Sequence, residues 1–477
     1  MAITPGSQSR AAAVQAVTSE NYLDIQNNGW AQQYLPDLME KEAEVFGQRT
    51  ISGFLGQVGA EEAMSADQVI WSEQGRLHLS YKCAMNAVAS STIDITHDID
   101  GNGRTTDHGI REGDQVLISG GSGATVTARV SVADAGNATI TVQPYGAAHM
   151  TDLSYVDGDD DCRILVFGSE NAKGTKYVGG RSNEPSFTTF TNKPIILKDM
   201  YEVSGSDVAQ VGWVEVSGED GQNGYYWYLK AEGDTRARFN DYLEMSMIES
   251  EKVAEASTIA LPTDGGAGAA GTEGLFAAIE ARGHQASGIT GVNAATDLAE
   301  FDAILAEFDK NGAIEENMLF VDRSTALAID DMLASMNSYG AGGTSYGVFD
   351  NDEDMALNLG FSGFRRGSYD FYKSDWKYLN DLATRGGINA SASTDAIRGV
   401  VIPAGVSSVY DQNLGKNLKR PFLHVRYRAS KTESRKLKTW ITGSVGAVTS
   451  DLDAMTVNFL SERCLVVQGA NNFMLLN

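Results

Sequence analysis

The first stretch that could do chemistry is HDIDGNGRTTDHG, which spaces oxygen-bearing side chains as calcium loops do. It offers ligands at alternating positions and one acid further on: Asp98, Asp100, Asn102 and Asp107. An EF-hand also needs flanking helices and a bidentate glutamate at the twelfth position, where this chain has Gly109. Two hypotheses stay open, a degenerate calcium site and a hairpin turn with solvated acids. The acidic run DGDDD, residues 157–161, leaves the same choice.

A second stretch matches the phosphate-binding pattern G-x-G-x-x-G and precedes a predicted helix. Its three glycines are Gly266, Gly268 and Gly271. In a dinucleotide site this pattern follows a strand and opens a βαβ unit. Here it follows a long predicted helix, and Pro262 and Asp264 interrupt the lead-in. We therefore expect a flexible hinge and no bound cofactor.

The sequence does not assemble a nucleophile with its base. The six histidines are scattered, and neither G-x-S-x-G nor H-E-x-x-H occurs. His284 directly follows a glycine, and we expect it to cap or pack. The three cysteines are too few and too far apart in sequence for a disulfide framework or a zinc site, so we expect them reduced and buried: Cys83, Cys162 and Cys464. The sequence predicts no enzyme and no catalytic, cofactor-binding or metal-binding residue.

The elements that would position such residues include one long helix. The segment from about Tyr225 to Ser257 has no proline and carries apolar residues at helical spacing, which predicts a helix of roughly 50 Å. A strand-like lead-in from Lys193 precedes it. A shorter helix follows, which Thr272 could cap and Gly283 could close. This order is typical of a structural building block.

Short alternating runs and turns fill residues 90 to 155. Val126, Ala128 and Val130 alternate with polar residues, and Ile140 and Val142 resume the pattern after a turn. The pattern predicts a small β-barrel or sandwich. It interrupts strand-like runs, QVIWSEQGRLHLSYK before it and CRILVFG and SFTTFTNKPIILKDMYEV after it, so we interpret it as an inserted domain.

Helix and strand alternate after the second helix. DLAEFDAILAEFDKNG has apolar residues on one helical face, ENMLFVD reads as a short buried strand, and STALAIDDMLASMN predicts a helix with Ser324 as its cap. Helix, strand and helix in this order predict a compact α/β layer. The following SYGAGGTSYG and FDNDEDMAL predict loops.

Length and charge limit the class of protein. Single cores stop growing near ~250 to 300 residues, so a chain of 477 residues predicts two or three domains. No apolar run approaches the ~20 residues that span a bilayer, and MAITPGSQSR lacks the regions of a signal peptide. We expect synthesis in the cytoplasm. The net charge of −26 argues against polyanion binding by the whole surface.

One segment reverses this charge. From Lys416 to Lys438 there are nine basic residues and one acid, Glu433. One hypothesis is a cationic strip that meets acidic surface on a neighbouring subunit, which would make assembly salt-sensitive. The other is a solvated strand face, which the alternation in FLHVRYRAS favours. Contact with DNA is a third and less favoured hypothesis.

Taken in order, these segments resemble the major capsid proteins of tailed bacteriophages, which have the Hong Kong 97-type fold. The resemblance rests on element order over nearly the whole chain, and no single motif carries it. It leaves the branch open, a marine or crAss-like one included. It implies an α+β fold with these parts: an N-terminal arm, 1–66; a hairpin called the E-loop, 67–200, with a β-rich insertion domain at about 90–155; a peripheral domain, 201–293, with a spine helix at about 225–257; an axial domain, 294–419; and a C-terminal return to the peripheral domain, 420–477.

The resemblance also implies a function. Such a protein assembles with itself into hexamers and pentamers, and so into an icosahedral shell that encloses double-stranded DNA without sequence-specific binding. The implied partners are portal and scaffold or decoration proteins, with no membrane, and the implied location is the virion after assembly in the host cytoplasm. Some family members join an E-loop lysine to a neighbour's asparagine. The candidates here, with no pair identified, are Lys173, Lys176, Asn471 and Asn472.

Two other classes remain open. A secreted acidic surface protein or adhesin with calcium-stabilised β-modules would use DIDGNG and DGDDD, but no signal peptide is visible and the C-terminal half has no repeats. A nucleotide-dependent enzyme would use GGAGAAG. Calcium-dependent melting would support the first class, and cofactor-induced protection of Gly266–Gly283 the second.

Overall fold

The computed structural model describes most of the chain after residue 52. The described residues are 53–58, 60–99, 101–120, 125–153, 156, 162–177, 182, 187–206, 215–217, 223–253, 271–312, 314–336, 363–391, 396–404, 406–411, 416–444 and 448–477. Most of the predicted arm, the run 157–161, the glycines Gly266 and Gly268, and the predicted loops at 338–357 lie outside these residues. The chain divides into a smaller compact unit that includes Tyr201–Ala237 and Thr442–Thr456, and a larger one that includes Ile51–Met200, Arg238–Ile441 and Val457–Asn477.

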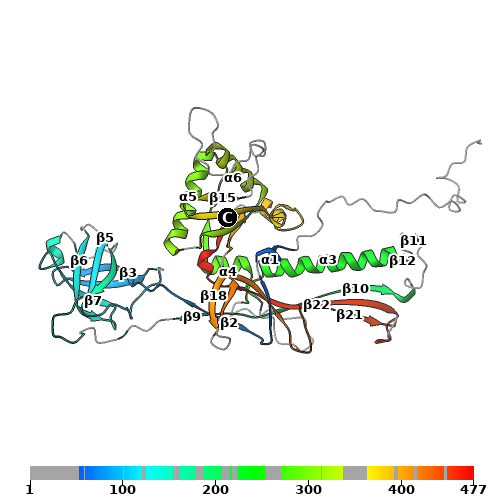
Figure 1. The fold of residues 1–477 in the computed structure, drawn as a ribbon, viewed down its shortest axis with the longest axis horizontal. Coiled ribbons are helices and arrows are strands. Elements are labelled where there is room, and N and C mark those ends of the chain that lie inside the picture. The colour runs from blue at the N-terminus through cyan, green and yellow to red at the C-terminus, as the bar shows by residue number, and fades with distance from the viewer. Residues whose placement is uncertain are drawn as a thin grey trace, which may run out of the picture. The chain divides into compact units, whose positions relative to one another are not determined.

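Six consecutive strands of the larger unit close a β-barrel (Figure 1). They are β3 (Ser80–Ala87), β4 (Thr92–Asp98), β5 (Asp114–Gly120), β6 (Val126–Asp134), β7 (Thr139–Pro144) and β8 (Cys162–Ser169), in the order β3-β4-β7-β6-β5-β8 around the barrel. A short 3-10 helix, η2 (Met150–Leu153), lies between β7 and β8. The barrel extends beyond the predicted 90–155, because Tyr81, Met85 and Ile164 also belong to its buried core.

Two strands flanking the barrel in sequence form a two-stranded ribbon. β2 (Val69–Gln74) pairs antiparallel with β9 (Phe187–Asn192), and Trp71 lies opposite Phe190. The sequence pattern places CRILVFG outside the inserted domain, among the runs that follow it. That placement is wrong, because β8 pairs with β3 and β5 and completes the barrel.

A five-stranded sheet joins segments from both ends of the chain. Its order is β1 (Ala60–Met64), β20 (Leu423–Arg428), β22 (Ala454–Val467) and β10 (Ile195–Ser204), and β21 (Lys438–Gly443) also pairs with β22. β1 runs parallel to β20, and the preceding helix α1 (Phe54–Val58) buries Phe54 and Leu55 in the core. The last residues of the predicted arm therefore belong to a packed core.

A six-stranded sheet carries two helices. Its order is β13 (His284–Ala286), β23 (Met474–Leu476), β17 (Gly399–Pro403), β14 (Glu316–Val321), β16 (Tyr369–Asp375) and β15 (Gly363–Arg366). The helices α5 (Ala294–Asn311) and α6 (Arg323–Met336) flank β14 in sequence and share a core with this sheet. The predicted order of helix, strand and helix is confirmed.

The helix caps only partly follow the sequence analysis. Asn293 caps α5 by accepting from the N–H of Ala295 and Thr296, and Gly312 ends it in the left-handed conformation (φ 61°). Asp322 caps α6, because its carboxylate accepts from the N–H of Thr325 at 2.9 Å. The predicted cap Ser324 instead donates its hydroxyl to Asp322 at 2.7 Å.

The long helix α3 (Tyr226–Glu249) is one unbroken rod (Figure 1) but ends eight residues before the predicted Ser257. Its 24 residues correspond to ~36 Å rather than ~50 Å. The chain leaves the helix because Ser250 accepts from the N–H of Gly274 and Lys252 forms a β-bridge with Gly271 (φ +66°). These two contacts hold the segment after α3 against the start of the next helix.

That next helix, α4 (Leu275–Arg282), has no side-chain cap. Gly274 occupies the N-cap position, and the predicted cap Thr272 donates elsewhere. Gly283 closes the helix by donating to Ile279, as the sequence predicted. The remaining elements are β11 (Glu215–Ser217) paired with β12 (Asn223–Tyr225), β18 (Val406–Asp411) paired with β19 (Lys416–Pro421), α7 (Lys377–Asn380), α8 (Arg385–Ser391) and the 3-10 helix η4 (Ala470–Asn472). Within the described residues, no helix is both long and apolar enough to cross a membrane.

Candidate functional site

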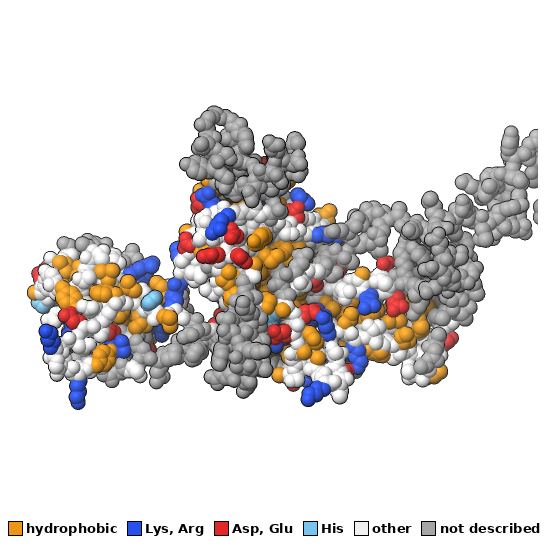
Figure 2. Space-filling model, viewed as in Figure 1, with side chains coloured by type: hydrophobic (Ala, Val, Ile, Leu, Met, Phe, Trp, Pro, Cys, Tyr) orange, Lys and Arg blue, Asp and Glu red, His pale blue; other side chains and the backbone are white. Residues whose placement is uncertain are grey.

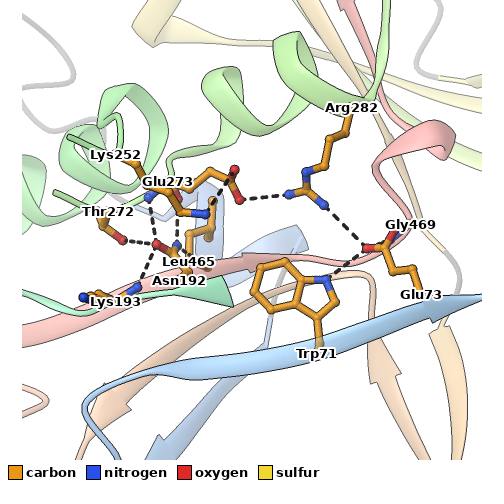
Figure 3. Close-up of polar contacts among 10 residues, drawn as sticks. All are labelled: Trp71, Glu73, Asn192, Lys193, Lys252, Thr272, Glu273, Arg282, Leu465 and Gly469. Carbon is orange, nitrogen blue, oxygen red and sulfur yellow. Dashed lines mark hydrogen bonds and ion pairs between the residues drawn. The ribbon is translucent and has the colours of Figure 1, made fainter. Parts of the chain in front are cut away.

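A buried asparagine stands at the end of the ribbon. Asn192 is the last residue of β9 and is 1% exposed. Its amide nitrogen donates to the carbonyls of Leu465 at 2.6 Å and Glu273 at 3.0 Å. Its oxygen accepts from the hydroxyl of Thr272 at 3.1 Å and from the N–H of Glu273 and Lys193, each at 2.9 Å. One side chain thus ties the ribbon to β22 and to the segment that leads into α4 (Figure 3).

An arginine makes the second link to the ribbon. Arg282, the last residue of α4, lies 2.9 Å from Glu273 and 3.5 Å from Glu73 of β2. Its guanidinium also lies 4.4 Å from the ring centroid of Phe190 and 5.7 Å from that of Trp71. Cation–π contacts and charge-assisted hydrogen bonds strengthen where water is largely excluded, and the Arg282 side chain is 14% exposed.

The carboxylate of Glu73 completes the arrangement. It accepts from the indole N–H of Trp71 at 3.0 Å and from the N–H of Gly469 at 2.9 Å, where β22 has just ended (Figure 3). We call Trp71, Glu73, Asn192, Glu273 and Arg282 the ribbon root. Its carboxylates are held by donors rather than aimed into a cavity, so the chemistry of the ribbon root is positioning: it fixes the angle at which the ribbon leaves the core.

Five of the nine basic residues of the predicted cationic strip pair with acids of the same chain. Arg426 pairs with Glu62 at 2.8 Å and Arg435 with Glu462 at 2.6 Å. Three further basic residues of the strip also pair: Arg428 with Asp67 and Glu462, Lys436 with Glu61, and Lys438 with Glu433. The charges of these five residues meet acids of β1, β22 and neighbouring turns, while Lys436 and Lys438 keep 47% and 43% of their side chains exposed. Contact of the strip with a neighbouring subunit stays a prediction. We call β1, β20 and β22 with these pairs the charged sheet.

The centre of the charged sheet is polar although the strand FLSERCLVV is mostly apolar. Glu462 is 6% exposed and Arg463 is 8% exposed. Arg463 donates to the carbonyl of Lys436 at 3.0 Å and lies 3.8 Å from Glu61. Burial lowers the pKa of the Arg463 guanidinium, and the carboxylates of Glu61 and Glu244 oppose that shift. Arg463 thus has a partner on β1 that lies about 400 residues earlier in the chain, so this contact is non-local, whereas Glu462 pairs with Arg428 and Arg435 of the nearby strip.

A carboxylate of α3 holds the start of α1. Glu244 accepts from the N–H of Gly53 at 2.6 Å, and the N–H groups of Phe54 and Leu55 also point to it. The unpaired N–H groups of a helix N-terminus favour a negative charge at this place. Burial raises the pKa of Glu244, although these hydrogen bonds act in the opposite direction. The contact fixes the place at which the N-terminal segment joins the core.

Charges of both signs also alternate on the described surface. Figure 2 shows basic and acidic side chains next to one another over α5 and β15. There Arg366 donates to both carboxylate oxygens of Asp302, at 2.5 and 2.7 Å. On the face that Figure 2 shows, the acidic side chains of this region therefore lie among basic ones and form no separate acidic patch.

The predicted calcium loop is organised by a side chain of its own. Asp98 accepts from the backbone and side-chain nitrogens of Asn102, at 2.9 and 3.2 Å, and from Arg104 at 3.2 Å. Burial acts to raise the pKa of Asp98, but these hydrogen bonds lower it overall. No group of three acids, histidines or cysteines in the described part of the chain could hold a metal ion. Asp98 is thus bonded as in a turn, and because Asp100 lies outside the described residues both hypotheses for this loop stay open.

The other residues singled out from the sequence lie apart from the ribbon root. His284 packs against Phe308 and lies 2.7 Å from the side chain of Asn311. All three cysteines are buried and none is in a disulfide, as expected. Lys173 and Lys176 are exposed after β8, and Asn471 and Asn472 lie in η4. No contact brings a lysine and an asparagine of this set together, and their crosslinking between copies stays a prediction.

Sequence reasoning missed the ribbon root and the buried charges. Asn192, Arg282 and Glu244 stand in segments that look like ordinary strand and helix ends. Only Glu462 and Arg463 carried a usable signal, because two adjacent charges interrupt an apolar strand, and charges in such places are paired when buried.

The comparisons with known proteins come from structures alone, since no family model and no curated protein matches the sequence. A solved structure from Mycobacterium phage Ogopogo is 12% identical, covers 94% of this chain and 97% of its own, and has a TM-score of 0.40. The capsid structure of the cyanophage P-SCSP1u is 9% identical, covers 94% of each chain and has a TM-score of 0.40. The mature capsid of bacteriophage PhiM1 is 9% identical, covers 92% of this chain and 91% of its own, and has a TM-score of 0.38. At these values the likeness establishes neither the family nor the function of the chain.

Proposed function

We propose that the chain is the repeating subunit of a tailed-phage capsid, the class that its order of elements resembles. In this proposal β2 and β9 form the base of the E-loop, the barrel is a domain inserted into that loop, α3 is the spine helix, and the sheet with α5 and α6 is the core of the axial domain. The proposed bounds stay those of the sequence analysis, with the insertion widened to 80–169.

The observation that carries the proposal is the two-stranded ribbon. β2 and β9 pair only with each other among the described strands, and two strands of six residues are marginally stable in water by themselves. Ile70 on this ribbon is 64% exposed. The ribbon root nevertheless fixes the ribbon firmly to the core. A firmly rooted ribbon with exposed apolar surface is suited to lie on a second copy of the chain.

Assembly follows from such contacts. A heterologous contact forms a ring only if its rotation closes, so hexamers and pentamers must share one interface with small adjustments. A stable interface of this kind buries more than ~1,000 Å². The N-terminal segment, which Glu244 holds where it joins the core, would add area under a neighbour. The shell would enclose double-stranded DNA, with portal and scaffold or decoration proteins as partners, in a virion assembled in the host cytoplasm.

The test is assembly of the full chain expressed alone, followed by sedimentation and negative-stain microscopy. We expect closed shells or six-membered rings. Ile70→Asp should give a folded monomer, because a charge on the ribbon opposes its burial against a neighbour, and the matched control Ile70→Val should assemble. A wild-type chain that stays monomeric at all concentrations and salt conditions would contradict the proposal. A monomer whose melting depends on a chelator would favour the calcium-stabilised surface protein.

A further inference from the structure

The first and last strands of the barrel bring two cysteines face to face. Cys83 on β3 and Cys162 on β8 are register partners in the antiparallel β3–β8 ladder. Both are fully buried in the barrel core, and neither is in a disulfide. Directly opposite residues of antiparallel strands point to the same side, with Cα atoms about 4.5 to 5.5 Å apart. That range lies inside the roughly 4.4 to 6.8 Å that disulfides span.

We propose that Cys83 and Cys162 are a disulfide site that closes the barrel when the protein meets a low-molecular-weight disulfide. One cysteine thiolate attacks the small disulfide, forms a mixed disulfide and releases one small thiol. The second cysteine thiolate then attacks the protein sulfur of this mixed disulfide and releases the second small thiol. The two cysteines together lose two protons and two electrons, and the small disulfide gains both.

The place of the pair in the ladder explains how a buried thiol can react. Cys162 is the first residue of β8, and its pairings with Cys83 and with Gly120 of β5 are the last of both ladders. A register shift lies between Lys82 and Cys83, where β3 pairs with β4. Strand ends open more often than the middle of a sheet, so local opening at this end exposes the thiols without unfolding the barrel.

The crosslink would act on the barrel as a whole. It would join the first strand to the last and close a loop of about 80 residues that contains the other four strands. A loop of this length strongly restricts the unfolded chain, so the effect on barrel stability is large in the chain-entropy account. The proposal rests on the barrel alone and does not depend on the function of the chain.

The third cysteine is a built-in control. Cys464 lies on β22, outside the barrel, opposite Arg426. Burial raises the pKa of its thiol to about 12, and its partner in the strand ladder is an arginine rather than a cysteine. Because of its position it should not join either barrel cysteine.

The experiment uses the full folded chain and oxidised glutathione. After incubation, free thiols are alkylated and the protein is digested without reductant for mass spectrometry. We expect one linked peptide pair, Cys83 with Cys162, two hydrogens lighter than the sum of its parts. The barrel's melting temperature should rise by about 10 °C or more and return on reduction.

Variants separate this crosslink from other thiol chemistry. Cys83→Ser and Cys162→Ser should each lose the temperature shift, and Cys464→Ser should keep it. Mass spectrometry of the linked peptides uses the wild-type protein alone. It therefore still tests the proposal if a serine variant fails to fold. Fully alkylated thiols after incubation, glutathione retained on one barrel cysteine, or a link that includes Cys464 would each overturn the proposal.

Discussion

The barrel and the charged sheet are both β-structures, but they are built from the chain in opposite ways. Every barrel strand comes from one continuous segment, and its interior is filled by alternating aliphatic residues. The charged sheet joins β1, which starts at Ala60, to β22, which ends at Val467, and buries Glu462 and Arg463 in its middle. The difference indicates that the barrel can form from the alternation of apolar and polar residues within one segment. The charged sheet forms only when β1 meets strands from the last part of the sequence.

The largest expected effect is on folding of the parts alone. A fragment of residues 78–171 should fold cooperatively, because it contains all six barrel strands and their core. A fragment of residues 416–477 should stay unfolded, because its buried charges lose their partners on β1. Amide dispersion in NMR spectra and thermal melts measure both. A folded C-terminal fragment would remove the contrast between the two regions.

A second test removes one buried carboxylate of the charged sheet. Glu462→Gln should lower the free energy of unfolding by about 3 kcal/mol, because it leaves Arg435 and Arg428 without this buried carboxylate. The matched control is Glu433→Gln, whose side chain is 50% exposed and pairs only at the surface with Lys438. Chemical denaturation should show a much smaller loss for that control, because an exposed ion pair adds little to stability. Equal losses in the two variants would contradict the difference in burial.

Acid should act with opposite sign on the barrel and on the contact of Glu244 with the start of α1. The pKa of Glu244 is raised above its ordinary 4.5, so the folded state binds this proton more tightly, and its contribution to stability rises as the pH falls through the folded pKa and is complete below 4.5. The pKa of Asp98 in the barrel is lowered below 3.8, so its contribution is lost as the pH falls through the folded pKa. Chemical denaturation between pH 7 and 3 measures the free energy of unfolding. Glu244→Gln should reduce its rise on acidification, and Asp98→Asn should reduce its fall. Effects of the same sign from both variants would contradict the assignment.

The smallest effect should come from the outer surface of the barrel. Lys82 on β3 lies directly opposite Arg163 on β8, and like charges in such a pair are destabilising. Lys82→Glu should raise the barrel's free energy of unfolding by less than about 1 kcal/mol, and the gain should shrink at high salt. Lys82→Gln should give a smaller gain with weaker salt dependence. A loss of stability in Lys82→Glu would mean that the lysine makes contacts which outweigh the repulsion.

The same contrast explains what the sequence could predict. Alternation of residues such as Val126 and Val130 indicated the barrel, because side chains on neighbouring strands of one segment share a core. Helical spacing indicated α3, α5 and α6, although Gly271 and Ser250 ended α3 through a contact that spacing does not reveal. The sequence did not indicate the ribbon root, because Asn192 acts through hydrogen bonds to Glu273 and Leu465, which are distant in sequence. The basic strip was visible, but its acidic partners were not.

The adjacency of β3 and β8 also has an evolutionary consequence. The chain enters and leaves the barrel on neighbouring strands, about 4.8 Å apart, and the flanking strands β2 and β9 are themselves paired at the same spacing. A recombination event could therefore remove the barrel or exchange it for another domain without changing the distance between β2 and β9. A foreign domain could be grafted at the same two connections, between β2 and β3 and between β8 and β9, while the ribbon stays unchanged.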